Sequence, residues 1–397
     1  MRFAEPCIPL GLAWSSPFVR WQGALAEVNS LDLAVGVTTE ALARRQVDPS
    51  SITRLVLGWT VPQRDSFYGA PTVAARLGAP GVTGPMLAQA CGTGVACVEA
   101  AAATVTLDPG GVVLVVTTDR TSNGPVLTYP APSGPGGAPD VERWVLDSFE
   151  RDPWAGGSMT TTAETVAAEA GITRGELDEL TLVRYQQYGD ALAGEREFQR
   201  PWMVPVTIPR RGRDPVVVDA DQGVHATTAE ALGKLAPVLP DGVVTYGTQT
   251  HPADGTAGLV VTDEARARSL SGGEGVARLL GTGVARVEKG RMPQAPVPAA
   301  ARALDAAGLA IGDVDVIKTH NPFAVNDVYF AQATGVDAAA MNPFGCSLVY
   351  GHPQAPTGTR GIAELIEVLR RRGGGTGLFT GCAAGDTGAA AVIRVEG

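Results

Sequence analysis

The stretch AQACGTGVACVEAAAATV, residues 88–105, joins an apolar run, a cysteine, two glycines and an alanine-rich helical pattern. A cysteine at this junction has two interpretations. Free cysteine is among the residue types most often buried in a core, whereas a helix N-terminus, with unpaired N–H groups and a favourable dipole, stabilises a thiolate nucleophile. Cys97, later in the same helical pattern, has the context of a core residue. The stretch therefore predicts a strand-to-helix junction, and the rest of the chain must decide what Cys91 does.

The spacing around Cys91 recurs in the second half of the chain. A strand is expected to end near Trp59, before Cys91, and another is expected to end at His320, before His352. His352 lies as far after His320 as Cys91 lies after Trp59, and a further buried strand follows each junction. The repeat predicts two copies of one βα unit, with Cys91 and His352 at equivalent helix starts that face each other across a pseudo-twofold axis.

Short runs rich in Val, Leu and Ile have the composition of buried parallel strands, with helical patterns between them, and this alternation predicts an α/β layered fold. The clearest helical period covers residues 358–372, and three glycines at 373–375 end it. The expected strands lie within residues 52–60, 111–119, 258–263, 314–320, 377–381 and 389–395.

The middle of the chain differs in character. Residues 121–140 are loop-rich, and Thr173 and Glu176 form a capping box that starts a helix. We therefore expect an N-terminal half made of residues 1–119 with 251–270, an inserted loop domain over 120–250, and a C-terminal half over 271–397.

Composition excludes several classes of function. The net charge of −10 and the pI near 5.0 argue against binding to nucleic acid. The N-terminus lacks a signal-peptide layout, and no apolar run is expected to reach the roughly 18 residues of a membrane span, which predicts a cytoplasmic protein. The five cysteines form no CxxC pair, so free thiols are expected, and no His, Cys and Asp spacing predicts a metal site.

The polar residues with the most suggestive contexts are few. The chain has four histidines, of which His320 and His352 lie in turn-like contexts, whereas His251 is expected in a solvated loop. Cys382 follows an apolar run and enters a small-residue turn, where the backbone can approach a ligand closely.

Six segments together resemble the thiolases in order and spacing, from about Ile52 to the C-terminus. The resemblance implies a duplicated five-layer αβαβα core with a loop domain inserted in the first half. It also implies obligate dimers, which can pair into tetramers. The segments are QACGTGVA (89–96), TDRTSNGP (118–125), GSMTTTAETVA (157–167), HNPFA (320–324), NPFGCSLVYGHPQAPTG (342–358) and GCAAGDTGAA (381–390).

The resemblance also implies roles for individual residues. Cys91 matches the nucleophile that becomes acylated, His352 the base that deprotonates it, and Cys382 the acid/base at the substrate α-carbon. His320 stands where many thiolases have asparagine and the sterol-carrier type has histidine, which helps to hold the oxyanion of the second substrate. The backbone N–H groups of Cys91 and Ala384 are expected to form an oxyanion hole.

Other positions depart from the common thiolase pattern. Gly-Ser-Met-Thr at 157–160 replaces a Gly-His-Met-Gly run, so Ser158 and Met159 are expected to line an altered acyl pocket together with Thr250 and Phe323. Val224 stands where an arginine is frequent, which puts the usual coenzyme A contacts in doubt.

The sequence thus predicts a thiolase-type acyltransferase that forms or cleaves a β-ketoacyl thioester through an acyl-Cys91 intermediate. Its partner would be an acyl-CoA or acyl-carrier thioester, with no further cofactor, and the chain would form a homodimer or tetramer. Two alternatives remain: a carrier-protein-dependent condensing enzyme, and a non-catalytic lipid-binding or scaffold subunit. A scaffold would not need Cys91, His320, His352 and Cys382 together.

Overall fold

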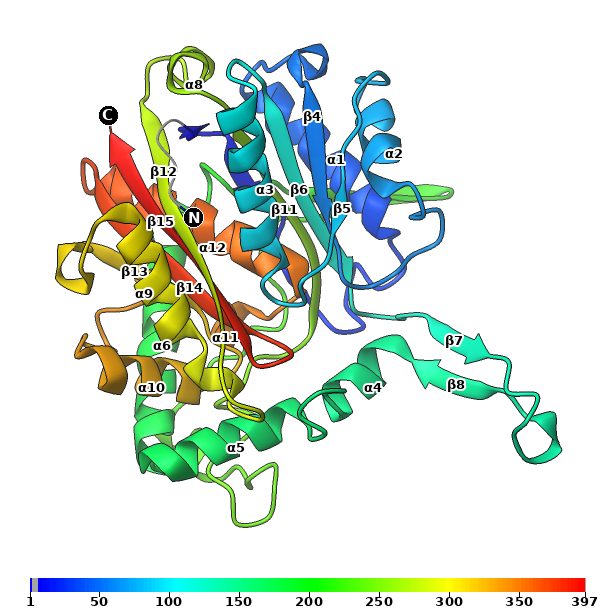
Figure 1. The fold of residues 1–397 in the computed structure, drawn as a ribbon, viewed down its shortest axis with the longest axis vertical. Helices are drawn as coiled ribbons and strands as arrows, with labels where there is room; N and C mark the ends of the chain where they lie inside the picture. Colours follow the sequence, from blue (N-terminus) through cyan, green and yellow to red (C-terminus); the bar gives the residue numbers. More distant parts are fainter. Residues whose placement is uncertain (2–5, 397) are drawn as a thin grey trace.

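The computed structural model describes Met1 and residues 6–396, and its core consists of two large β-sheets separated and covered by helices (Figure 1). The first sheet has the order β2 (Ala13–Ser15), β11 (Ala253–Val261), β6 (Val113–Arg120), β4 (Arg54–Gly58) and β5 (Met86–Leu87), and β3 (Val19–Arg20) also pairs with β11. The second has the order β1 (Cys7–Pro9), β12 (Val276–Arg286), β15 (Thr387–Glu396), β14 (Gly375–Ala383) and β13 (Val316–His320).

The expected internal repeat is present in the topology. In each sheet a parallel pair, β4 with β6 or β13 with β14, is flanked by an antiparallel strand, β11 or β15. The expectation that segments 258–263 and 389–395 form parallel strands is therefore wrong. Both strands are buried almost throughout, and a strand buried on both faces lacks the alternation that distinguishes antiparallel strands in sequence.

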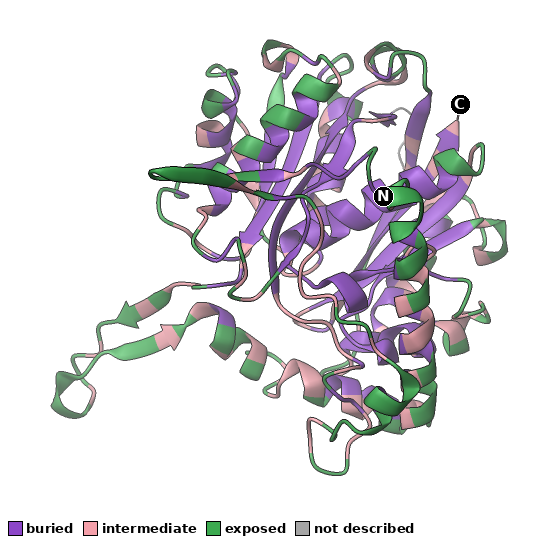
Figure 2. Ribbon diagram, turned by 180° about the vertical axis from the view of Figure 1, so that it is seen from behind, coloured by how far each residue is buried: buried purple, intermediate pink, exposed green. Residues whose placement is uncertain are grey.

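Five layers result. Helices α3 (Thr93–Leu107) and α12 (Ala355–Arg371) lie between the sheets. Helices α1 (Ser30–Arg44) and α2 (Gly69–Arg76) cover the first sheet, and α9 (Pro296–Ala307) and α10 (Ala324–Thr334) pack against the second. Most of α12 is buried, as the purple central elements in Figure 2 show, whereas one side of α3 is only partly covered. Helix α8 (Glu264–Leu270) connects the halves.

The central helices make close contact. A Cβ at Gly94 on α3 would lie only 2.6 Å from the backbone nitrogen of Thr359 on α12, so a glycine is needed there. Residues 90–107 have a mean hydropathy of 1.4 over 18 residues, so the expectation that no apolar run reaches the length of a membrane span is wrong. This stretch, however, contributes α3 to the core between the sheets.

The insertion begins as a hairpin where a loop was expected. Strands β7 (Val126–Tyr129) and β8 (Asp140–Arg143) form an exposed arm that projects from the body (Figure 2). Helices α4 (Trp144–Glu150) and α5 (Met159–Ala170) then run below both sheets, and α6 (Arg174–Arg196) rises from there next to α10 (Figure 1). The hairpin of β9 (Val206–Arg210) and β10 (Arg213–Val218) and helix α7 (Ala229–Gly233) complete it.

The capping box predicted at the start of α6 is confirmed, because the Thr173 hydroxyl accepts from the Glu176 N–H and the Glu176 carboxylate accepts from the Thr173 N–H. All five cysteines lie in the described part of the chain and are free, as expected.

A buried ionic cluster attaches the insertion to the central layer. The Arg360 guanidinium on α12 bonds both carboxylate oxygens of Asp221, at 2.7 and 2.8 Å, and Glu364 at 2.9 Å. Lys318 also approaches Glu364 at 2.7 Å. The Arg360 guanidinium stacks on the Tyr350 ring, 3.6 Å from its centroid. Each charge is thus paired, which offsets much of the cost of burying it.

Candidate active site

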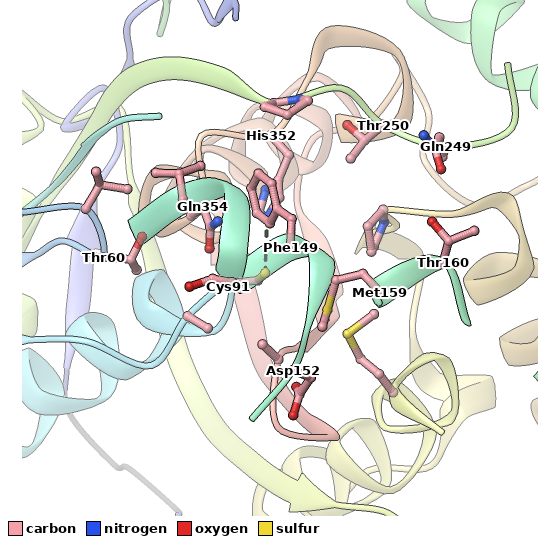
Figure 3. A pocket seen from close by; sticks show the side chains of 18 of the residues that line it. Thr60, Cys91, Phe149, Asp152, Met159, Thr160, Gln249, Thr250, His352 and Gln354 are labelled. Carbon is pink, nitrogen blue, oxygen red and sulfur yellow. Dashed lines mark hydrogen bonds between the residues drawn. The ribbon is translucent and has the colours of Figure 1, made fainter. Parts of the chain in front are cut away.

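A cavity of about 440 Å³ lies beside the carboxyl ends of β4, β13 and β14, since residues that follow these strands line it (Figure 3). The inserted helices α4 and α5 form its opposite wall. Residues from both halves and from the insertion therefore meet at one site. The lining includes Thr60, Cys91, Trp144, Phe149, Met159, Thr250, Met292, Phe323, His352 and Ala384.

Cys91 lies between β5 and α3, directly after Ala90, whose φ of 44° turns the chain sharply. Burial raises the pKa of its thiol to about 12, although the backbone N–H groups of Ala384 and of Cys91 itself act in the opposite direction. Burial thus outweighs the helix-terminus effect expected from the sequence. In the free protein Cys91 is a neutral thiol, and it needs a base to become a nucleophile.

His352 lies where such a base is needed. Its Nε2 lies 3.1 Å from the Cys91 Sγ, the dashed contact in Figure 3, and its Nδ1 lies 2.6 Å from the Thr357 hydroxyl. Burial lowers the pKa of His352 well below its usual range, so the ring is neutral and Nε2 can accept a proton. The two equivalent helix starts expected from the repeat are thus in hydrogen-bond contact.

His320 and Cys382 flank this pair from the ends of neighbouring parallel strands, where His320 is in register with Gly381. The His320 ring stacks on His352 with centroids 4.0 Å apart, and burial lowers the pKa of His320 to about 3. Cys382 is 1% exposed and receives a hydrogen bond from the Asn326 amide at 3.2 Å. Burial and the nearby Cys91 raise the pKa of Cys382 well above its usual range, so its thiol is protonated.

Comparison with known proteins shows the family of this chain. Residues 12–265 match the family model described as the thiolase N-terminal domain, and residues 274–395 match the thiolase C-terminal domain. The chain belongs to the thiolase family. It is a thiolase-type acyltransferase by family, as the sequence predicted.

Individual relatives span nearly the whole thiolase chain. A beta-ketothiolase of Cupriavidus necator is 32% identical over 382 residues, covering 94% of this chain and 95% of the relative. The human mitochondrial 3-ketoacyl-CoA thiolase is 28% identical over 389 residues, covering 96% of each. The crystal structure of the Bacillus anthracis acetyl-CoA acetyltransferase superposes with a TM-score of 0.91 at 30% identity, covering 99% of each chain. The predicted thiolase fold is thus confirmed.

Three of the four predicted substrate-binding residues, Met159, Thr250 and Phe323, line the cavity. Ser158 does not, and its assignment to the pocket lining is wrong for the described structure. Its hydroxyl instead caps α5 by accepting from the Thr161 N–H, because an unpaired N–H at a helix start is a strong donor.

His251 is another correction to the sequence-based expectations for this thiolase. It was expected in a solvated loop, but its imidazole packs against Gly223 and Gly351, and its Nε2 is buried. The backbone oxygen of His251 accepts from the His352 N–H at 2.9 Å. His251 therefore supports the loop that carries His352. Val224 packs near an aromatic cluster instead of facing the cavity.

Several residues of the site escaped prediction. Asp119, at the end of β6, accepts hydrogen bonds from the N–H groups of Thr60, Val61 and Ala355 and from the Thr60 hydroxyl. It thereby fixes the cavity wall to the first turn of α12. A carboxylate that closely follows the apolar run 112–116 was the available signal. Trp144 in the insertion has no comparable motif.

The fold also brings together potential metal ligands that no sequence spacing predicts. One ligand atom each from Cys91, His320 and His352 lie within 4.8 Å of one another. The two rings are stacked at 28°, so their in-plane lone pairs run nearly side by side and do not converge on one point. The arrangement therefore favours proton transfer and hydrogen bonding over tetrahedral coordination.

Selective alkylation tests the state of Cys91. Because burial raises the pKa of Cys91 to about 12, its labelling by iodoacetamide should accelerate about tenfold per pH unit from about pH 7 to 10 without a plateau. Cys97, which is completely buried, should remain unlabelled under the same conditions. Peptide mass spectrometry measures both sites. Equal labelling, or a Cys91 rate that levels off near neutral pH, would contradict this assignment.

Proposed function

We propose that this thiolase transfers acyl groups between coenzyme A thioesters through an acyl-Cys91 intermediate, and that its preferred substrates carry apolar acyl chains longer than acetyl. The contact of 3.1 Å between Cys91 Sγ and His352 Nε2 at the cavity supports acyl transfer through Cys91. The apolar lining of that cavity supports the preference for longer apolar chains.

Thiolytic cleavage would begin when the Cys91 thiol gives its proton to His352 Nε2 and Sγ bonds to the β-carbonyl carbon. The resulting oxyanion would accept from the N–H groups of Cys91 and Ala384, which already point to the sulfur. The bond between the α- and β-carbons then breaks, and the Cys382 thiol protonates the α-carbon of the departing enolate. Because burial raises the pKa of Cys382, this thiol is kept protonated for that step.

The second half-reaction would restore the enzyme. The Cys382 thiolate takes the proton of an incoming coenzyme A thiol, whose sulfur attacks the acyl group on Cys91. The Cys91 thiolate leaves and recovers its proton from His352. Protons and bonds balance over the two halves, and the same steps in reverse form a β-ketoacyl thioester.

The acyl chain would lie against helix α4. Trp144 is fixed by a hydrogen bond of 2.8 Å from its Nε1 to the Thr60 backbone oxygen, and Phe149 lies one turn further along α4. Met159 and Met292 add flexible apolar surface. A longer apolar acyl chain buries more apolar surface against this wall than an acetyl group does, and it therefore gains more free energy by leaving water.

A panel of acyl-CoA thioesters of increasing chain length tests the proposal, with the mass increment on Cys91 and the thiolysis rate as readouts. We expect acetoacetyl-CoA to be cleaved poorly compared with a longer β-ketoacyl-CoA. Phe149→Ala should lower kcat/KM for the longer substrate about tenfold, since a lost apolar contact costs about 1–2 kcal/mol.

Leu146→Ala provides the matched control, because Leu146 is on the same helix, 40% exposed and outside the cavity lining. It should leave the chain-length profile unchanged. Efficient cleavage of acetoacetyl-CoA together with no dependence on chain length would overturn the substrate class. Acylation by a carrier-protein thioester but by no coenzyme A thioester would overturn the proposed donor.

A further inference from the structure

The two stacked histidines meet different hydroxyl groups. His352 Nδ1 lies 2.6 Å from the Thr357 Oγ1, and His320 Nδ1 lies 2.9 Å from the Ser347 Oγ. His352 Nε2 faces Cys91, whereas His320 Nε2 is buried and has no partner among the described residues. A neutral imidazole has one donor and one acceptor nitrogen. If the hydroxyl accepts a hydrogen bond from Nδ1, then Nε2 is the acceptor, and if the hydroxyl donates to Nδ1, then Nε2 carries the hydrogen.

The role of His352 sets its tautomer. To take the proton of Cys91, Nε2 must present a lone pair, so Nδ1 must carry the hydrogen and donate it to the Thr357 oxygen. Thr357 stands in the first turn of α12, and the residue is only 2% exposed. The short contact of 2.6 Å fits a fixed donor and acceptor pair.

His320 needs the other tautomer. Its unpartnered Nε2 can hold a substrate oxygen only if it carries the hydrogen, and Nδ1 must then accept from Ser347. The Ser347 hydroxyl has one hydrogen, and its competing acceptor, the Asn321 Oδ1, is 3.5 Å away. The contact of 2.9 Å to His320 is the better bond.

We propose that Ser347 and Thr357 hold His320 and His352 in opposite tautomers, and that Ser347 is a positioning residue that makes His320 a hydrogen-bond donor to the thioester oxygen of the second substrate. The inference rests on the proposed roles of Cys91 and His352. It explains why two neutral imidazoles lie face to face: one accepts a proton while the other donates a hydrogen bond, and only one of them becomes charged.

The surroundings keep Ser347 in place. Its backbone oxygen accepts from the Thr250 hydroxyl at 2.5 Å. Asn321 is turned toward it because the Asn321 amide donates to Asp327 at 2.7 Å. Asp327 in turn is paired with Arg184 at 2.8 Å, and both of their side chains are 1% exposed or less. Ser347 thus belongs to a rigid buried network, and its hydroxyl has little freedom to choose another partner.

Nitrogen-15 NMR of histidine-labelled protein tests the tautomers directly, because the chain has only four histidines. We expect an Nδ1–H signal for His352 and an Nε2–H signal for His320, assigned with single His→Gln variants. Ser347→Ala should shift His320 toward the Nδ1–H form while the His352 signal is retained, which also reports that the site is folded. Finding both rings in the same tautomer would overturn the proposal.

Kinetics provides the second readout. Ser347→Ala should slow exchange of the α-protons of the second thioester, and condensation, by about 10- to 100-fold. Acylation of Cys91 should change little, since its oxyanion is held by backbone N–H groups. Ser347→Thr, which keeps the hydroxyl, should restore most of the rate. Ser15→Ala, at an equally buried serine outside the site, should leave the rate unchanged.

Two outcomes separate the inference from the proposed function. Normal condensation by Ser347→Ala would show that this hydroxyl does not position His320. A wild-type protein that has opposite tautomers but accepts no acyl thioester would leave the tautomer assignment standing and reject the proposed function.

Discussion

Replacing Cys382 with alanine should lower condensation and thiolysis by about 100-fold or more while leaving Cys91 able to accept an acyl group. Acylation by an acyl-CoA requires the Cys91 thiol, the His352 base at 3.1 Å and two backbone N–H groups. Cys382 would only protonate the departing coenzyme A thiolate, which is a good leaving group without that proton. Proton movement at the α-carbon requires a separate acid/base, a role that we propose for the Cys382 thiol. Intact-mass spectrometry and steady-state kinetics on one preparation measure the two properties.

The controls for Cys382→Ala come from the other cysteines. Cys91→Ala should abolish acylation and turnover together. Cys346→Ala removes a thiol from the same buried cluster as Cys382 but has no step in the scheme, so its turnover should stay within about threefold of wild type. A Cys382→Ala protein that condenses normally, or one that no acyl donor labels, would show that Cys382 is misassigned.

Replacing Arg360 with methionine should destabilise the protein by about 3–5 kcal/mol, because it leaves the Asp221 carboxylate buried without its cationic partner and leaves Glu364 paired with Lys318 alone. All three side chains are 1% exposed or less. Arg360 also joins the insertion to α12, so its loss should loosen the wall of the cavity. Denaturant titration measures the free energy of unfolding.

The matched control is Arg370→Ala, at the solvent-exposed end of the same helix. Its partner is Glu367 and its own side chain is 41% exposed, so solvent screens the pair and the loss should be about 1 kcal/mol or less. Similar losses for the two variants would mean that the buried cluster contributes little to stability.

The sequence predicted the catalytic junctions better than their surroundings. The four candidate catalytic residues lie at or just beyond strand ends or at helix starts: Cys91, His320, His352 and Cys382. Glycine-rich turns at such junctions are visible in the sequence, so the positions of these residues could be predicted. The matched spacing of the halves predicted that Cys91 and His352 meet. The raised pKa of the Cys91 thiol could not be predicted from the sequence, because it depends on how deeply the surrounding elements bury the thiol.

Residues that act through tertiary contacts were harder to predict. Ser158 was placed in the pocket by its position in a motif, but a free N–H at the start of α5 attracts its hydroxyl. Asp119 and Ser347 lie within the segments that resemble thiolases, yet their partners come from distant parts of the chain. Trp144 belongs to the insertion, where the sequence carries no repeated pattern.

During synthesis, strand β1 must wait for a partner strand that lies far along the chain. Residues 7–9 pair with residues 276–278 of β12, so strand β1 completes the sheet of the other half of the chain. At about 5–20 residues per second, this strand waits roughly 15 to 50 s for its partner. The base His352 is made later still. A nascent or truncated chain that lacks the last strands therefore exposes unpaired strand edges, which chaperones bind. Such a chain also lacks the pair of Cys91 and His352.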